Sequence, residues 1–165
     1  MLLAVQSRRA SPPSLTGPIL APSRCQVAAN KFHSVALGAD GRCWTWGHGR
    51  GGRLGHPDFE VHSGQHAVIF PRVVVGLGKR QVVQVAAAKH HTLAMTDSGE
   101  LFSWGSNKDG RLGYANVDTQ PVPKRVIVGN KARVVGISAG SKHSAAVTAA
   151  HELFTWGSNS WGQLG

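Results

Sequence analysis

The segment 47–52 reads GHGRGG and fits the G-x-G-x-x-G pattern of a dinucleotide-binding loop. Such a loop holds a pyrophosphate on backbone N–H groups only where it joins a strand to a helix. The segments 105–110 and 157–162 keep the first and last glycines of this pattern and lack the middle one. Glycines that recur in this way are typical of turns that need a positive φ. The sequence therefore predicts no nucleotide and no other cofactor.

Nine histidines form the second group that could do chemistry. His33, His91 and His143 take the same position in three copies of one repeated unit, so each is expected on a separate structural element. A buried histidine hydrogen-bonded to backbone is the expected role of each. The remaining histidines, including His62 and His66 in a polar segment, are expected at the surface. No metal centre is predicted.

Side chains for nucleophilic or acid–base catalysis follow no recognisable motif. The eight acidic residues offer no paired carboxylates, and no hydroxyl or thiol is arranged with a base. Cys25 and Cys43 are too few for a disulfide framework and lack the spacing of a zinc site, as expected of a reduced intracellular chain. We therefore expect a protein that is not an enzyme.

The charge is strongly positive, with eighteen Lys and Arg against eight Asp and Glu and a formal net charge of +10. Such a balance favours acidic partners, among them nucleic acid, an anionic membrane and an acidic protein face. The basic residues are scattered in short pairs such as Lys124-Arg125, which favours a solvated basic surface over a dedicated phosphate-binding stripe. No apolar stretch approaches the roughly 20 residues that span a bilayer, so no membrane insertion is predicted.

One sequence unit recurs three times. Residues 27–55, 85–113 and 137–165 align without gaps at offsets of 58 and then 52 residues. The extra residues of the longer offset fall in the polar stretch 56–70, which is expected to be a surface loop. A fixed period of about 52 residues indicates a repeat architecture.

The second copy shows how each unit folds. Residues 82–87, 91–96 and 100–104 have the composition of strands, with a turn between the last two. A further short strand is expected after each linking proline, Pro71 and Pro123. Four strands in a period near 50 residues predict an all-β fold made of the four-stranded antiparallel blades of a β-propeller.

The third copy departs from the pattern at two turns. His151 replaces the glycine found at Gly99 in the second copy, so a different turn is expected there. Trp161 replaces the turn residue Asp109 and is a candidate exposed anchor for a partner, or a contact to a blade that this chain lacks.

The repeat resembles that of the regulator-of-chromosome-condensation family, which has His-Ser/Thr, Trp-Gly and Leu-Gly pairs at constant spacing. These landmarks are His33, His91 and His143, then Trp46-Gly47, Trp104-Gly105 and Trp156-Gly157, then Leu54-Gly55, Leu112-Gly113 and Leu164-Gly165. The segments GHGRGGRLGH and VAAAKHHT look most similar to the propeller of inhibitor-of-Bruton-tyrosine-kinase-like proteins. The resemblance implies a seven-bladed ring, of which this chain holds about two and a half to three repeats. The tryptophans of the Trp-Gly pairs are expected to pack between blades.

The chain divides into a disordered leader or linker at residues 1–24 and a partial propeller at 25–165, expected from a truncated gene product or from part of a longer protein. An intracellular location in cytoplasm or nucleus is expected, and the Arg- and Ser-bearing leader leaves organelle targeting open. The predicted function is a protein-interaction scaffold. Guanine-nucleotide exchange on a small GTPase and chromatin or nucleic-acid association are the alternatives.

Overall fold

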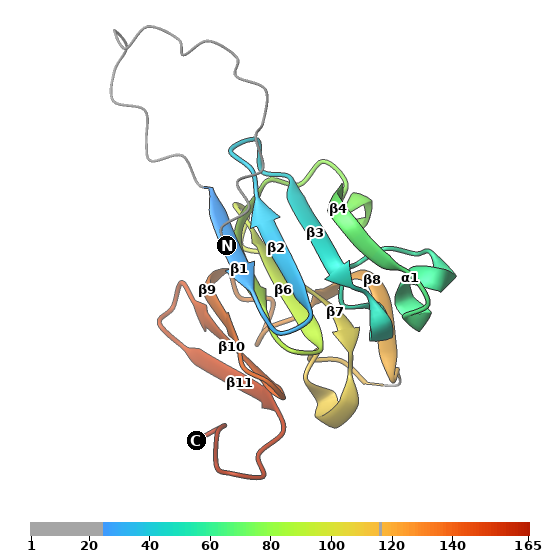
Figure 1. The fold of residues 1–165 in the computed structure, drawn as a ribbon. Coiled ribbons are helices and arrows are strands. Elements are labelled where there is room, and N and C mark those ends of the chain that lie inside the picture. The colour runs from blue at the N-terminus through green and yellow to red at the C-terminus, as the bar shows by residue number, and fades with distance from the viewer. Residues whose placement is uncertain (1–24, 116) are drawn as a thin grey trace, which may run out of the picture.

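Three antiparallel β-sheets lie side by side in the computed structural model, which describes residues 25–115 and 117–165 (Figure 1). The first sheet contains β1 (Gln26–Ala29), β2 (His33–Leu37), β3 (Cys43–His48) and β4 (Ala67–Val73). The second contains β5 (Val82–Ala87), β6 (His91–Thr96), β7 (Leu101–Ser106) and β8 (Thr119–Val126). The third contains β9 (Val134–Ala139), β10 (His143–Thr148) and β11 (Leu153–Gly157). The predicted all-β blades in an incomplete ring are confirmed.

Strand boundaries in the second blade match the sequence prediction closely. β5 and β6 have the predicted ranges, whereas β7 begins at Leu101 and continues two residues beyond the expected end, to Ser106. The same register recurs in every blade, where the repeat histidine of the second strand lies opposite the glycine of the Trp-Gly pair. Equal spacing in sequence therefore gives equal pairing in space.

The linking prolines lie within strands, so the prediction that a strand follows them is wrong in its boundaries. β4 contains Pro71 and β8 contains Pro123. Each is the last strand of its sheet and pairs with one neighbour only. Proline is tolerated there because an edge strand leaves alternate N–H groups without a ladder partner.

The stretch 56–70 is more ordered than a surface loop. It contains the short helix α1 (Phe59–Ser63), whose following residue Gly64 has a φ of 90° and donates its N–H to the carbonyl of Val61. Its last residues already belong to β4, which begins at Ala67. A single helical turn carries too few residues to show a helical period in sequence, so the helix was not predicted.

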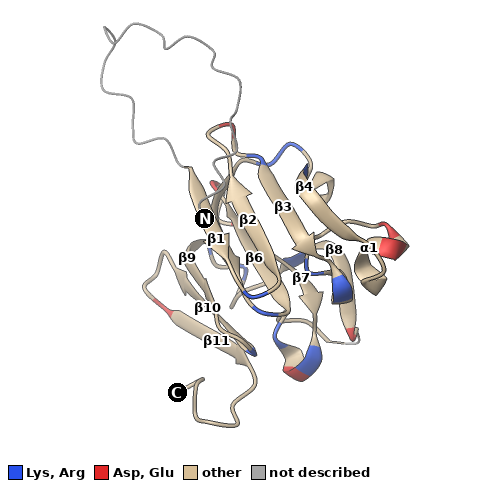
Figure 2. Cartoon of the chain, in the orientation of Figure 1, with Lys and Arg blue, Asp and Glu red and all other residues tan. Residues whose placement is uncertain are grey.

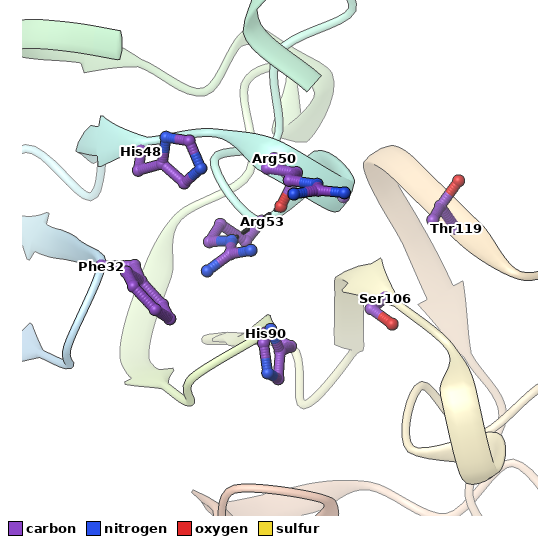
Figure 3. A pocket seen from close by; sticks show the side chains of 8 residues that line it. Phe32, His48, Arg50, Arg53, His90, Ser106 and Thr119 are labelled. Atoms are coloured by element: carbon purple, nitrogen blue, oxygen red, sulfur yellow. Dashed lines mark hydrogen bonds between the residues drawn. The ribbon is translucent and has the colours of Figure 1, made fainter. Parts of the chain in front are cut away.

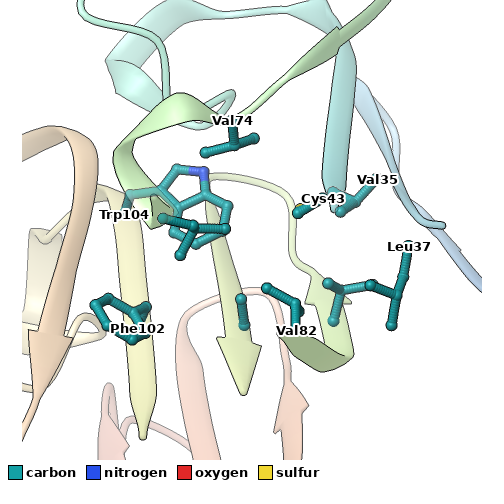
Figure 4. Close-up of a cluster of buried hydrophobic side chains, with 10 residues drawn as sticks. Val35, Leu37, Cys43, Val74, Val82, Phe102 and Trp104 are labelled. Atoms are coloured by element: carbon teal, nitrogen blue, oxygen red, sulfur yellow. The ribbon is translucent and has the colours of Figure 1, made fainter. Parts of the chain in front are cut away.

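The hydrophobic core lies between the blades. Side chains of β2, β3 and the segment after β4 meet those of β5, β6 and β7 in one cluster (Figure 4). Trp104 is its largest member and is fully buried. A second cluster of the same kind joins the second and third blades. Each blade therefore buries its apolar face against its neighbour, as repeat architectures require.

The turn at His151 is the same turn as in the other copies, and the expectation of a different one is wrong. His151 has a φ of 62°, close to the 80° of Gly99. Each donates its backbone N–H to the residue three positions earlier, Thr148 and Thr96, at 2.9 Å. The blade imposes the left-handed conformation although histidine disfavours it.

The proposed leader, residues 1–24, lies outside the described residues. Within the part that the structure describes, no helix is long and apolar enough to cross a membrane.

Candidate functional site

The repeat histidines make hydrogen bonds across the seams between blades. Nε2 of His33 lies 2.8 Å from Oγ1 of Thr92 in the next blade. That hydroxyl donates in turn to the carbonyl of Arg53 at 2.8 Å. Because the hydroxyl has one hydrogen and uses it there, His33 must donate from Nε2. The second seam has the same arrangement in His91, Ser144 and the carbonyl of Arg111.

This arrangement corrects the partner predicted for these side chains. His33 and His91 are buried, but each bonds to a hydroxyl of the next blade and not to backbone. Burial, helped by the charge of Arg53, lowers the pKa of His33 to about 4, and burial lowers that of His91 to about 3. Nδ1 of each has no hydrogen-bond partner among the described residues. His143 begins β10 and is half-buried.

Tryptophans of the Trp-Gly pairs reach the same carbonyls. Nε1 of Trp104 donates to the carbonyl of Arg53 at 3.0 Å, and Nε1 of Trp156 to that of Arg111 at 3.0 Å. Gly55 makes room for the first indole, since a Cβ there would lie 2.9 Å from Trp104 Nε1. One carbonyl therefore accepts from both a hydroxyl and an indole of the following blade. Trp46 lies in β3 and is half-buried.

The glycines of the Trp-Gly pairs allow two strands to approach closely. Gly47 has a φ of 111°, and a Cβ on it would lie 2.6 Å from the carbonyl oxygen of Phe32. Gly105 and Gly157 have the same geometry in their own blades. The remaining landmarks are Leu54 and Leu112, which are buried, Leu164, which is half-buried, and Gly113 and Gly165, which both have positive φ.

Two glutamines also form hydrogen bonds across the seams, and these residues were not predicted from the sequence. The side-chain amide of Gln26 accepts from Val85 N at 2.8 Å and donates to Val85 O at 3.0 Å. Gln84 holds Ile137 in the same way, at 3.1 and 3.2 Å. The signal was present, because the two glutamines are 58 residues apart, which is the offset between their repeats.

Other predicted residues lie at the surface or in the interior. Trp161 is 92% exposed, and its backbone N–H donates to Oε1 of Gln163. His66 is exposed and His62 half-buried. His56, expected at the surface, is buried, donates to the Thr45 hydroxyl at 3.0 Å and has a pKa lowered by burial to about 4. No group of three potential metal ligands occurs in the described chain.

Open cavities lie where neighbouring blades meet, and two of them are lined by charged side chains. The cavity of about 450 Å³ between the first two blades, here called the first-seam pocket, is lined by Phe32, His48, Arg50, Gly51, Arg53, His90, Ser106 and Thr119 (Figure 3). The cavity of about 510 Å³ between the second and third blades, the second-seam pocket, is lined by His90, Ser106, Lys108, Asp109, Arg111 and Lys142. Both are basic. Figure 2 shows Lys and Arg at the same end of the two blades, after β3 and after β7.

Blades, seams and repeat landmarks together define a repeat-built β-propeller. A family model described as the regulator of chromosome condensation (RCC1) repeat matches residues 40–95 and 98–147, and a second model with that description matches 25–53, 82–111 and 134–163. The chain therefore belongs to the RCC1 repeat family.

Individual relatives and solved structures match most of this chain. The ultraviolet-B receptor UVR8 of Arabidopsis thaliana is 34% identical over 84% of this chain and 30% of its own length. The crystal structure of human WBSCR16 aligns with a TM-score of 0.72 at 25% identity, over 80% of this chain and 32% of that one. Prp20p of Saccharomyces cerevisiae aligns with a TM-score of 0.66 at 25% identity, over 80% and 32%. This chain spans about a third of each of these relatives.

Proposed function

We propose that this chain is a protein-binding module whose blades form a rigid support for one contact surface. The single observation that carries the proposal is that different sets of side chains hold the blades together and cover one end of them. The histidines and tryptophans of the repeat landmarks make hydrogen bonds inside the described seams. The turns at one end of the blades differ between copies, with Phe32, His90 and Lys142 at one equivalent position. Variable side chains on loops held by a rigid scaffold are typical of binding surfaces.

The variable surface, here called the loop face, consists of the turns at 30–32, 88–90 and 140–142 and the 3-10 helices η1 (Arg50–Gly52) and η3 (Lys108–Gly110). Its charged side chains are mostly basic: Lys31, Arg50, Lys89, Lys108 and Lys142, with Asp109 as the acidic exception. Phe32 adds an aromatic ring beneath the ammonium group of Lys31, at 5.4 Å. A surface of this kind complements an acidic patch on another protein. Trp161, largely exposed, is a further contact in this proposal.

The test reverses charge on the loop face. The triple variant Lys31→Glu, Lys89→Glu, Lys142→Glu is compared with a matched triple away from that face, Lys79→Glu, Lys124→Glu, Lys131→Glu. Partners are captured from nuclease-treated extract of the source cells, and each is then purified and titrated against the purified chain. We expect a binary complex that the first triple weakens at least about tenfold, or ~1.4 kcal/mol, and that the second leaves intact. Absence of any binary complex, or equal effects of the two triples, would contradict the proposal.

A second candidate is guanine-nucleotide exchange on a small GTPase, or association with chromatin. It is favoured by the similarity to Prp20p, whose structure report names binding to Gsp1p and histones, and by the net charge of +10. Nucleotide release from a panel of small GTPases tests the first activity, and unchanged release rates remove it. Binding to DNA that does not weaken with rising salt contradicts an electrostatic chromatin contact. An intracellular location, in agreement with two free cysteines, accompanies either function.

A further inference from the structure

Two equivalent arginines, Arg53 and Arg111, lie at the seams and are both more than nine-tenths buried. Their backbone carbonyls accept the seam hydrogen bonds, and their guanidinium groups are held alike. Nε of Arg53 donates to the carbonyl of Arg50 at 2.7 Å, and Nη1 donates to that of Lys89 at 2.9 Å. Arg111 makes the equivalent two bonds, at 2.6 and 3.4 Å. The two sites therefore form an internal comparison.

The two arginine sites differ in one charged partner. Nη2 of Arg111 pairs with the carboxylate of Asp109 at 2.7 Å. At Arg53 the equivalent position is Gly51, which has nearly the same backbone conformation, with φ and ψ of 74° and 19° against 64° and 15°. No described residue accepts a hydrogen bond from Nη2 of Arg53 or forms an ion pair with that side chain. The first seam thus keeps the arginine and lacks the carboxylate.

The unpaired guanidinium faces the first-seam pocket. Figure 3 shows the Arg53 side chain pointing into the space between Phe32 and His90, and its Cζ lies 5.0 Å from the Phe32 ring centroid. The described lining of this pocket contains no acidic residue, whereas Asp109 lines the second-seam pocket. Burial and the nearby charge of Arg50 lower the pKa of Arg53. A buried cation without an anion is costly, so the site favours a ligand that supplies one.

We infer that the first-seam pocket binds the carboxylate of an aspartate or glutamate in an acidic segment of a partner protein, seated on Nη2 of Arg53 where the second seam has Asp109. The choice of a carboxylate follows from the second seam, where the same guanidinium geometry already holds one. Arg50 extends the positive charge toward solvent, and Phe32 gives the ligand an apolar wall. This inference rests on the proposed protein-binding function and names the chemistry of its partner.

Gly51→Asp is the sharpest perturbation, because it supplies the missing carboxylate from within the chain. Position 51 has space for a side chain, because a Cβ on Gly51 would meet only Ser106 Cβ, at 3.9 Å. Its backbone conformation also permits an aspartate, since Asp109 already adopts it in the second blade. Gly51→Asn is the neutral control of similar shape. Asn130→Asp adds the same charge at an exposed turn on the opposite end of the blades.

The probe is a short fluorescein-labelled oligoglutamate peptide, titrated against the full chain by fluorescence anisotropy at low salt. We expect Gly51→Asp to weaken binding about tenfold, equivalent to ~1.4 kcal/mol, while Gly51→Asn and Asn130→Asp stay within about twofold of the original chain. Asp109→Gly should leave Arg111 without its carboxylate partner, so that the second-seam pocket binds a second equivalent of peptide.

Fluorescein-labelled single-stranded DNA is titrated as a second probe. Three outcomes would overturn the inference: no binding of the peptide, equal peptide binding by Gly51→Asp and Gly51→Asn, or a Gly51→Asp effect that weakens DNA binding and leaves peptide binding unchanged, which would assign the pocket to nucleic acid. Inorganic phosphate serves as a competitor, and displacement of the peptide by low phosphate concentrations would favour a phosphate ligand instead. If the lysine triple abolishes a partner complex that Gly51→Asp leaves intact, the proposed function stands and this inference fails. If the peptide result holds and no partner complex forms, the carboxylate site stands and the proposed protein-binding function fails.

Discussion

Acidification should loosen the seams through the buried histidines, and His33 gives the clearest test. This side chain is 3% exposed and donates from Nε2 to Thr92, and its Nδ1 has no partner within the described chain. Protonation would place a cation in the buried interior and beside the charge of Arg53, and for these reasons, burial first, the pKa of His33 falls from 6.5 to about 4. The unfolded chain binds a proton at this residue between those two values, and the folded chain does not. Its stabilising effect is therefore complete above about pH 6.5 and declines as the pH falls toward 4.

The size of the effect follows from the two pKa values. At pH 5 the difference in proton binding destabilises the fold by about 2 kcal/mol for His33 alone, and the full shift corresponds to roughly 3 kcal/mol below pH 4. His91 and His56 add effects of the same sign, because burial lowers the pKa of each. A loss of this size is a large fraction of the stability of an ordinary domain.

The assay is urea denaturation of the original chain and of His33→Gln at intervals between pH 7.5 and pH 4. Glutamine keeps an Nε2 donor for Thr92 and cannot titrate, so the variant should lose less stability on acidification, by about 2 kcal/mol at pH 5. Nitrogen chemical shifts of the imidazole report the protonation directly. The reasoning would be refuted by a His33 resonance that titrates near 6.5, or by equal pH dependence of the two proteins.

Further predictions concern the seam and the turns. Thr92→Val removes the hydroxyl between His33 and the next carbonyl and should cost about 2 kcal/mol, whereas Thr92→Ser should cost less than half of that; equal losses in urea denaturation would refute the relay. Gly105→Ala places a Cβ 2.5 Å from a carbonyl oxygen and should cost more than about 2 kcal/mol, against about 1 kcal/mol for Gly110→Ala, where no atom lies within 4 Å. His151→Gly relieves a left-handed histidine and should raise the free energy of unfolding by about 0.5–1 kcal/mol, and a fall in thermal midpoint would count against that strain.

Periodicity predicted the blades because every copy repeats the same strand-forming pattern. The ranges of β5 and β6 could be read from their β-branched composition and the turn that follows them. The start of β4 could not, since Pro71 resembles a boundary and is acceptable only because that strand lies at a sheet edge. The prediction for the turn at His151 was wrong for a related reason. The low propensity of histidine for a positive φ is overridden by the contacts of the blade around it.

The sequence identified residues of the seams but not the partners that they contact. The Ser or Thr that follows each repeat histidine was noticed as part of a landmark, but its partner lies in the neighbouring blade, 59 residues away in the case of His33 and Thr92. Sequence alone does not say which copy a side chain faces. The role of Arg53 could not be predicted from the sequence, because its lack of a carboxylate partner is apparent only by comparison with Arg111 in the folded chain.

The seam hydrogen bonds carry an implication for how such a chain can grow. At each of the two described seams, the earlier unit contributes a histidine and an arginine carbonyl, and the later unit contributes a hydroxyl and an indole. When the encoding segment is duplicated, the new copy carries the donor and acceptor groups for the seam on each side, so it can form the same hydrogen bonds with both neighbours. Lengthening the array then requires no compensating substitution at the joint, and residues outside it, such as Gly51 against Asp109, are free to diverge into new specificities.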